Sequence, residues 1–364
     1  GVELMSAIAM SHSSRNDVTK AATWTDRYLP IAEQLGLLGP TTRGMIGRGS
    51  GLLMVGRPRE GIVLLRGAHQ LAIANDLRDL ELVARILMTF FEQWGEPAAG
   101  LALAREGIEI GQRLGSRNYS SQMAGNGSIC ALRTGDWDWA ATLLDEWLAI
   151  DTVFTQQAEF FVDRAILRTL RGEDATADIE SATQLRVSGG ITDPQWESYE
   201  LWATAWAAFV EGRYDEARRL GTHAVELTTY FAPLAYPLVI RSALYAGDAP
   251  GAAATLALLD ASGYRGPALV ADRLVATAGI DALGGRGASA VAGYRDALRA
   301  YRQLGLAFDE ATAAVDIATL LPADERDAPD IVVAITAARE TLERLGSRPF
   351  LERLDRVRPK EHAG

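Results

Sequence analysis

The stretch WAAFVEGRYDEARRLG, residues 206–221, decides the fold. Two segments rich in helix formers flank Gly212, and neither alternates apolar and polar residues as a half-buried strand does. A glycine readily takes the left-handed conformation that ends a helix, and acidic residues just after it suit the first turn of the next helix. The stretch therefore predicts a helical hairpin that turns at Gly212, with the small Ala217 where the two helices approach closely.

The same pattern recurs along the chain at a nearly constant step of 35 to 40 residues. The predicted turn glycines are Gly56, Gly95, Gly135, Gly172, Gly212, Gly247 and Gly285. A small residue stands five positions after each of them: Gly61, Gly100, Ala140, Ala177, Ala217, Ala252 and Ala290. A step of this length is typical of a solenoid built from helical hairpins.

The rest of the chain fits an all-α solenoid of about eight hairpins, because strand signals are nearly absent. We expect a partial helix pair in residues 1–40, seven repeats in residues 41–305, and a last repeat with a capping helix and short tail in residues 306–364. The second helix of a repeat often ends in a Leu-Gly phrase or at an asparagine. These predicted helix ends are Gly36, Asn75, Gly115, Gly305 and Gly346.

The hairpins resemble tetratricopeptide-like repeats, whose second helix carries a small residue at the equivalent position. When the turn glycine is counted as the fifteenth residue, the eighth is also small in most units, as in Gly49, Ser128, Ala165, Ala205 and Ala278. The step is longer than the roughly 34 residues of that family, and its large aromatic near the unit start is mostly missing. The resemblance implies a right-handed superhelix whose first helices line the concave side.

The ending AARETLERLGSRPFLERLDRV, residues 337–357, carries a second resemblance. With the Leu-Gly phrases and the Ala/Arg-rich composition, it is similar to the C-terminal helical repeats of bacterial STAND signalling ATPases, notably large LuxR-type transcription regulators and adenylate cyclases with a central ATPase module. The resemblance implies a sensor or oligomerisation arm joined to an output domain outside this chain. The chain begins with Gly1, so we expect it to be cut from a larger protein.

Composition narrows the classes of partner. The net charge is −11, and the arginines form no block, which argues against binding nucleic acid or an anionic membrane surface. Apolar runs fall far short of the roughly 18 residues of a membrane helix, and no signal peptide is present. Cys130 is the only cysteine and cannot form an internal disulfide. We expect a soluble, cytoplasmic protein.

No motif indicates catalysis in this chain. The patterns GxxxxGK[ST], GxSxG, HExxH and CxxC are absent, and the four histidines are spread over the whole length. The acidic run at residues 324–330 falls in a predicted loop, where a solvated charge cluster is the ordinary interpretation. We therefore predict no enzyme activity, no cofactor and no metal site.

A binding surface is better supported. In the family, fixed positions of the first helix face the concave groove, and in the repeat quoted above they hold a stripe of four aromatic residues, Tyr199, Trp202, Trp206 and Phe209. Such a stripe suits the apolar anchors of a peptide, or it fills the seam between neighbouring repeats; both interpretations stay open. The same positions elsewhere hold Gln122, Arg133 and Arg241, which could clamp a peptide main chain or a carboxylate, or be ordinary surface residues.

The sequence thus favours a non-catalytic interaction and sensing module. It would capture a peptide, a protein segment or a small effector in its concave groove and pass the change to an output domain. Two alternatives stay open: a small-molecule-binding or catalytic helical protein with a closed pocket, and a scaffold that forms homo-oligomers.

Overall fold

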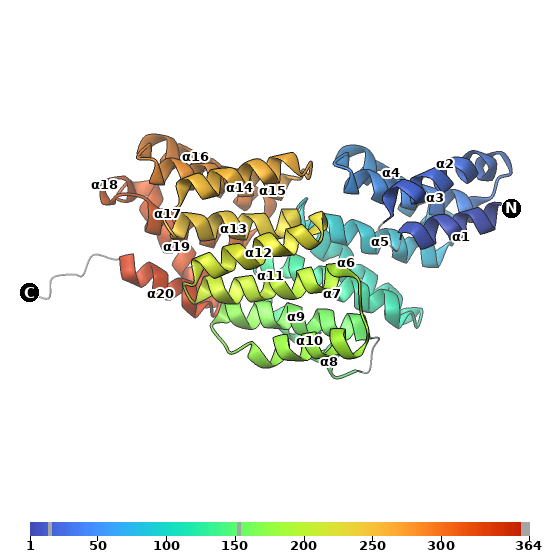
Figure 1. The fold of residues 1–364 in the computed structure, drawn as a ribbon, viewed down its shortest axis with the longest axis horizontal. Coiled ribbons are helices and arrows are strands. Elements are labelled where there is room, and N and C mark those ends of the chain that lie inside the picture. The colour runs from blue at the N-terminus through green and yellow to red at the C-terminus, as the bar shows by residue number, and fades with distance from the viewer. Residues whose placement is uncertain (14–16, 151–153, 358–364) are drawn as a thin grey trace, which may run out of the picture. The chain divides into compact units, whose positions relative to one another are not determined.

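The structure, a computed structural model, describes residues 1–13, 17–150 and 154–357 (Figure 1). Its regular elements there are all helical. The first ten helices are α1 (Val2–Ser13), α2 (Val18–Gln34), α3 (Leu38–Met54), α4 (Pro58–Ala74), α5 (Arg78–Glu92), α6 (Pro97–Arg113), α7 (Arg117–Thr134), α8 (Trp137–Leu148), α9 (Phe154–Arg171) and α10 (Thr176–Ser188). The others are α11 (Pro194–Val210), α12 (Tyr214–Leu227), α13 (Ala232–Tyr245), α14 (Ala249–Ala261), α15 (Pro267–Leu283), α16 (Gly287–Leu304), α17 (Ala307–Leu320), α18 (Ala323–Arg326), α19 (Pro329–Leu345) and α20 (Arg348–Val357), with a 3-10 turn at Thr229–Phe231.

The prediction of an all-α solenoid is confirmed. Helices follow one another as successive pairs, from α1 with α2 to α17 with α19, and the quoted stretch forms α11, a turn and α12. The turn glycines with a left-handed backbone, at φ between +71° and +84°, are Gly56, Gly135, Gly172, Gly212, Gly247 and Gly285. The predicted second-helix ends with a left-handed glycine are Gly36, Gly115, Gly305 and Gly346. The division into residues 1–40, 41–305 and 306–364 stays a prediction.

Of two further local predictions, the helix end at Asn75 is right and the close contact at Ala177 is wrong. Asn75 is the C-cap of α4, and the left-handed residue is the next one, Asp76, at φ +55°. In the fourth repeat Ala177 is exposed. The loop after Gly172 is longer than in the other repeats, so that helix α10 begins four residues after the glycine and the fifth position falls in its first turn. The buried side chain there is Asp178, paired with Arg164.

Small residues allow close helix packing where the sequence predicts it. In α3 and α4, Gly49 and Gly61 face each other so closely that a Cβ on Gly61 would lie 2.6 Å from the carbonyl oxygen of Gly49. A side chain at either position would force the two helices apart.

The helices group into two compact units. The first comprises Gly1–Gln93, Ala99–Gly127 and Ser262–Gly266; the second comprises Trp94–Ala98, Ser128–Ala261 and the chain from Pro267 onward. The boundary in the middle of the chain falls within α7, directly after Gly127.

The second unit closes on itself. The first helix of each hairpin contacts the first helix of the next: α9 with α11, α11 with α13, α13 with α15, and α15 with α17 (Figure 1). The C-terminal helix α20 then contacts both α17 and α9. The hydroxyl of Ser347 donates to the carbonyl of Leu170 at 2.7 Å, and the guanidinium of Arg353 donates to the carbonyl of Phe209 at 2.5 Å. These bonds fasten the C-terminal helix to the ends of α9 and α11.

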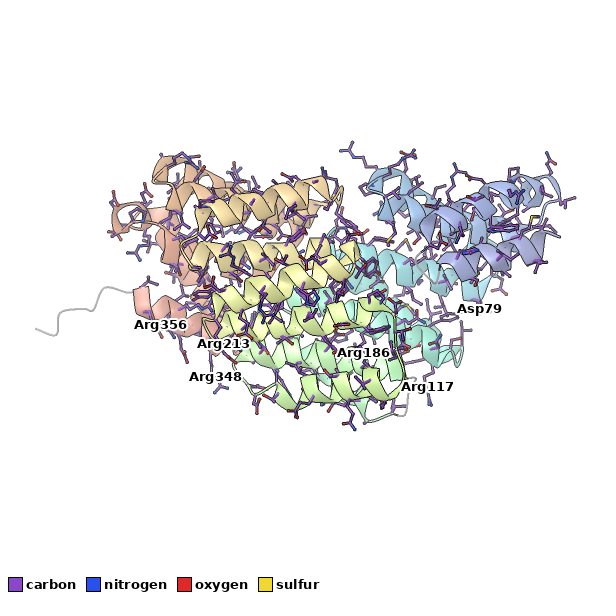
Figure 2. All side chains as sticks on the ribbon, in the orientation of Figure 1. Asp79, Arg117, Arg186, Arg213, Arg348 and Arg356 are labelled. Atoms are coloured by element: carbon purple, nitrogen blue, oxygen red, sulfur yellow. The ribbon has the colours of Figure 1, made fainter. Side chains whose placement is uncertain are left out.

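Surface arginines are mostly tied to nearby groups. Among those labelled in Figure 2, Arg356 pairs with Glu352 at 3.7 Å, Arg213 with Glu211 at 2.7 Å, and Arg348 donates to the carbonyl of Gly172. No helix of the described residues is long and apolar enough to cross a bilayer.

Candidate functional site: a cavity in the second unit

The helices of the second unit surround a cavity of about 90 Å³. Side chains from α7, α9, α11, α13, α15, α16 and α17 line it. Most of them are apolar, including Ile129, Leu132, Leu238 and Val275. The face that was expected to be a groove therefore holds a narrow, largely apolar cavity in this unit.

Helical periodicity explains how each helix reaches the cavity. On α13, the residues Pro233, Pro237, Arg241 and Leu244 are spaced by three or four positions and so form one stripe, and all four line the space. Pro237 lies inside this helix and has no N–H to donate to the carbonyl of Pro233. The stripe thus combines apolar rings with one buried guanidinium.

One wall of the cavity carries an ion-pair network centred on Arg133. Its Nε donates to Asp309 at 2.6 Å and its terminal nitrogen to Asp272 at 2.7 Å, while the hydroxyl of Tyr301 also donates to Asp272 at 2.7 Å. Burial disfavours the charge on Arg133, but the two carboxylates outweigh it and raise the arginine pKa. Burial likewise raises the pKa of Asp309 to about 6, against the opposing effect of Arg133. The network joins α7 to α15 and α17.

A second network lies on α13. The Nε of Arg241 donates to the carboxylate of Asp316 at 3.0 Å, and the hydroxyl of Tyr245 donates to the same carboxylate at 2.9 Å. Burial is the largest influence on Asp316 and raises its pKa, with Arg241 opposing. Arginine and aspartate charges around the cavity therefore neutralise each other at close range.

Three polar atoms of the lining side chains have no hydrogen-bond partner among the described residues. They are the indole Nε1 of Trp202, the indole Nε1 of Trp206 and the Oδ2 of Asp272. Leaving a buried donor or acceptor unpaired costs about 1–3 kcal/mol. A molecule in the cavity could therefore accept hydrogen bonds from the two indoles and donate one to Asp272.

The residues predicted to bind a partner have different locations. Trp202, Trp206, Arg133 and Arg241 all line the cavity. The structure brings these four together although they come from three different helices.

The remaining three do not line it. Phe209 is fully buried, 4.3 Å from the Arg353 guanidinium, because α20 covers this end of α11. Tyr199 is buried, stacks on Trp202 with ring centroids 5.9 Å apart, and donates a hydrogen bond to Asp163. Gln122 belongs to the first unit, where its amide donates to the carbonyl of Asn118. Phe209 and Tyr199 thus pack within the unit, and partner binding by these residues stays a prediction.

Sequence reasoning missed several cavity residues, namely Asp272, Tyr301, Phe308 and Asp309. Asp309 lies in the first turn of α17, where an acidic residue is ordinary because it favours the helix dipole. Its pairing with Arg133 has no local signal in the sequence.

A buried acidic cluster lies beside the cavity wall. Asp163 on α9 is fully buried and accepts hydrogen bonds from the hydroxyls of Ser128, at 2.5 Å, and Tyr199. Burial raises the pKa of Asp163 to about 7, although both hydroxyls favour the carboxylate. Burial and the Asp163 charge also raise the pKa of Glu159, one helical turn away. Burial thus brings the pKa of the Asp163 carboxyl close to neutrality.

Among the described residues there is no group of three or more His, Cys, Asp or Glu side chains placed to hold a metal ion. The walls of the cavity offer hydrogen bonds, ion pairs and apolar contact.

No protein-family model matches the chain, and no curated protein matches it. Among solved structures, the chain is similar to yeast Tom70, at 12% identity over 98% of this chain and 81% of that one, with a TM-score of 0.37. It is also similar to the TPR domain of P58(IPK), at 12% identity over 98% of each chain, with a TM-score of 0.25. The assignment of the fold rests on the helices and their contacts, not on these likenesses.

Proposed function

We propose that the chain is a non-catalytic effector-binding module and that a small molecule binds in the cavity of the second unit. The observation that carries the proposal is the cavity itself, where Trp202, Trp206 and Asp272 retain unpaired polar atoms within apolar walls. Ligand sites have this composition, mostly apolar with a few polar groups that fix orientation. Closure by the network of Arg133 favours a small effector over a peptide along this face.

Filling the cavity tests the proposal. Ala276 on α15 lines the space, so Ala276→Leu should occupy it, whereas Thr277→Leu places a leucine on the exposed side of the same helix, away from the cavity. A ligand-observed NMR screen of single-ring and short-chain molecules should find binders for the wild type and for Thr277→Leu, and none for folded Ala276→Leu. Equal binding to both variants, or none to the wild type, would refute the proposal.

The biological setting of this module is also a proposal. The similarity of residues 337–357 to STAND proteins supports a sensor arm of a bacterial signalling or transcription regulator, in which effector binding is passed to an ATPase, cyclase or DNA-binding domain. Reading the full gene tests this directly, because an open frame without such a domain would contradict it.

A protein-interaction or scaffold role is the second candidate, and one observation favours it. The segment from α1 to α3 of the first unit exposes several large apolar side chains, among them Leu4 at 66% and Leu35, just after α2, at 63%. A large exposed apolar patch is a common mark of an interface. Light scattering should then show a stable dimer that the double variant Leu4→Glu/Leu35→Glu dissociates; a monomer at all concentrations would exclude self-association through this face.

A further inference from the structure

The size of the cavity limits what can enter it. Its volume is about 90 Å³, below the roughly 150 Å³ of an engineered protein cavity that holds benzene. A ligand must therefore be small, of the order of one ring or a short branched chain, and it must push the walls outward slightly. The walls offer aliphatic side chains and the rings of Trp202, Trp206 and Phe308, so most of the ligand surface must be apolar.

The charges of the walls are already balanced. Arg133 and Arg241 face Asp272 and Asp309 around the cavity. The charge of Asp316, behind Arg241, is offset by that arginine and by Arg353, and both lower its pKa. A charged ligand would add an unpaired charge to a largely apolar site, which is unfavourable. The ligand is therefore uncharged.

The unpaired polar atoms of the cavity walls indicate which polar group the ligand carries. Trp202 and Trp206 each offer an N–H donor, and Asp272 offers one carboxylate oxygen. Trp202 is 5% exposed, and the Asp272 side chain is 8% exposed, so solvent cannot fully substitute for a ligand. A hydroxyl or a primary amide both accepts and donates hydrogen bonds, and so can pair with an indole and with the carboxylate.

We infer that the ligand class is a small uncharged amphipathic molecule, an apolar body of about one ring that carries a hydroxyl or amide group. The inference rests on the proposed function, since it describes the occupant of the same cavity. Apolar contact supplies most of the binding, and the indole donors and Asp272 select the polar group.

Four probes that share one ring show whether the cavity prefers a hydroxyl, no polar group, an anion or a cation. They are benzyl alcohol, toluene, benzoate and benzylammonium. Binding is measured at neutral pH by ligand-observed NMR with the full chain. Benzyl alcohol should bind about tenfold more tightly than toluene, because a tenfold difference in Kd corresponds to about one net hydrogen bond. Benzoate and benzylammonium should bind more weakly than toluene, because each buries a charge.

Matched variants locate the polar contacts. Trp206→Phe and Trp202→Phe each remove an indole N–H and keep an aromatic ring, whereas Trp196→Phe makes the same change on α11 away from the cavity. At least one of the first two should reduce benzyl alcohol binding about tenfold and leave toluene binding unchanged, while the third changes neither. A purely structural role would weaken both probes together, and two cavity positions keep the test available if one variant fails to fold.

The outcomes distinguish the inference from the proposed function. Tighter binding of either ion, equal binding of all four probes, or indifference of benzyl alcohol to both cavity variants would overturn the ligand class and leave the cavity as a binding site. Should the four probes fail while the wider screen finds a ligand that Ala276→Leu excludes, again only the ligand class is wrong. Failure of probes and screen together would remove the proposed function as well.

Discussion

Arg133 and Asp309 are 176 residues apart in the sequence, yet the Nε of Arg133 donates to the Asp309 carboxylate at 2.6 Å. The same guanidinium holds Asp272. One side chain of α7 thereby connects to two later helices of the second unit, α15 and α17. This connection holds three helices together around the cavity.

Replacing Arg133 should therefore destabilise the second unit strongly. In Arg133→Ala, Asp272 and Asp309 lose their common cation although their side chains are only 8% and 16% exposed, at a cost of about 3–5 kcal/mol. Arg133→Lys keeps the charge but lacks the planar fork that binds both carboxylates, so it should recover only part of the loss. Urea unfolding followed by circular dichroism measures the free energy of unfolding of both variants.

Arg356→Ala is the matched control, since this arginine is 73% exposed and its loss should change the free energy of unfolding by less than about 0.5 kcal/mol. If Arg133→Ala were no more costly than this control, the ion pairs would not be what closes the unit.

The sequence predicts the repeats well because their signals are local. A turn glycine and a small residue five positions later lie within one hairpin, and both act on that hairpin alone. The pairing that connects the helices of the second unit has no such local signal, because the distance from Arg133 to Asp309 depends on how curvature accumulates over five repeats. Trp206 and Phe209 illustrate the limit: they share one stripe of α11, but α20 covers Phe209 and leaves Trp206 at the cavity. No pattern in residues 206–221 indicates where α20 lies.

Arg353 should be the residue that holds α20 in place. Its guanidinium lies 4.3 Å from the ring centroid of Phe209 and donates to carbonyls at the C-terminal end of α11, where a positive charge is favourable. Arg353→Ala should cost about 3 kcal/mol through the lost cation–π contact and charged hydrogen bonds.

Limited proteolysis gives a local measure of the same effect. Cleavage before α20 should be faster in Arg353→Ala than in Arg356→Ala, which changes the same helix on its exposed side. Equal cleavage rates would mean that the packing of Phe350 and the hydrogen bonds of Ser347 and Arg348 retain the helix without Arg353.

Substituting each of two glycines of α4 with alanine should change the free energy of unfolding in opposite directions. Gly61→Ala places a Cβ 2.6 Å from the carbonyl oxygen of Gly49, so overpacking of about 1–3 kcal/mol should exceed the helix-propensity gain. Gly67→Ala meets only the flexible end of Met45, at 3.2 Å, and should stabilise the first unit by up to about 1 kcal/mol. Thermal unfolding of the two variants checks the signs, and stabilisation by both would contradict the close approach of α3 and α4.

Asp163 should make the second unit less stable as the pH rises. Its pKa is about 7 in the folded protein because the side chain is buried, and about 3.9 in an unfolded chain. Between these values the folded state holds a proton that the unfolded state has released. The stabilisation is complete below about pH 4, falls by at most about 1.4 kcal/mol per pH unit up to about pH 7, and is then fully lost.

Asp163→Asn tests this dependence because an amide resembles the protonated acid in shape and hydrogen bonding. Urea unfolding of the wild type at intervals from pH 5 to pH 8 should show a stability loss that is clearly smaller in Asp163→Asn, with part of it remaining because burial also raises the pKa values of Glu159 and Asp309. Asp215→Asn, at a side chain that is 91% exposed, should keep the wild-type slope. If Asp163→Asn also kept that slope, the carboxyl of Asp163 would be ionised throughout, held so by the hydroxyls of Ser128 and Tyr199.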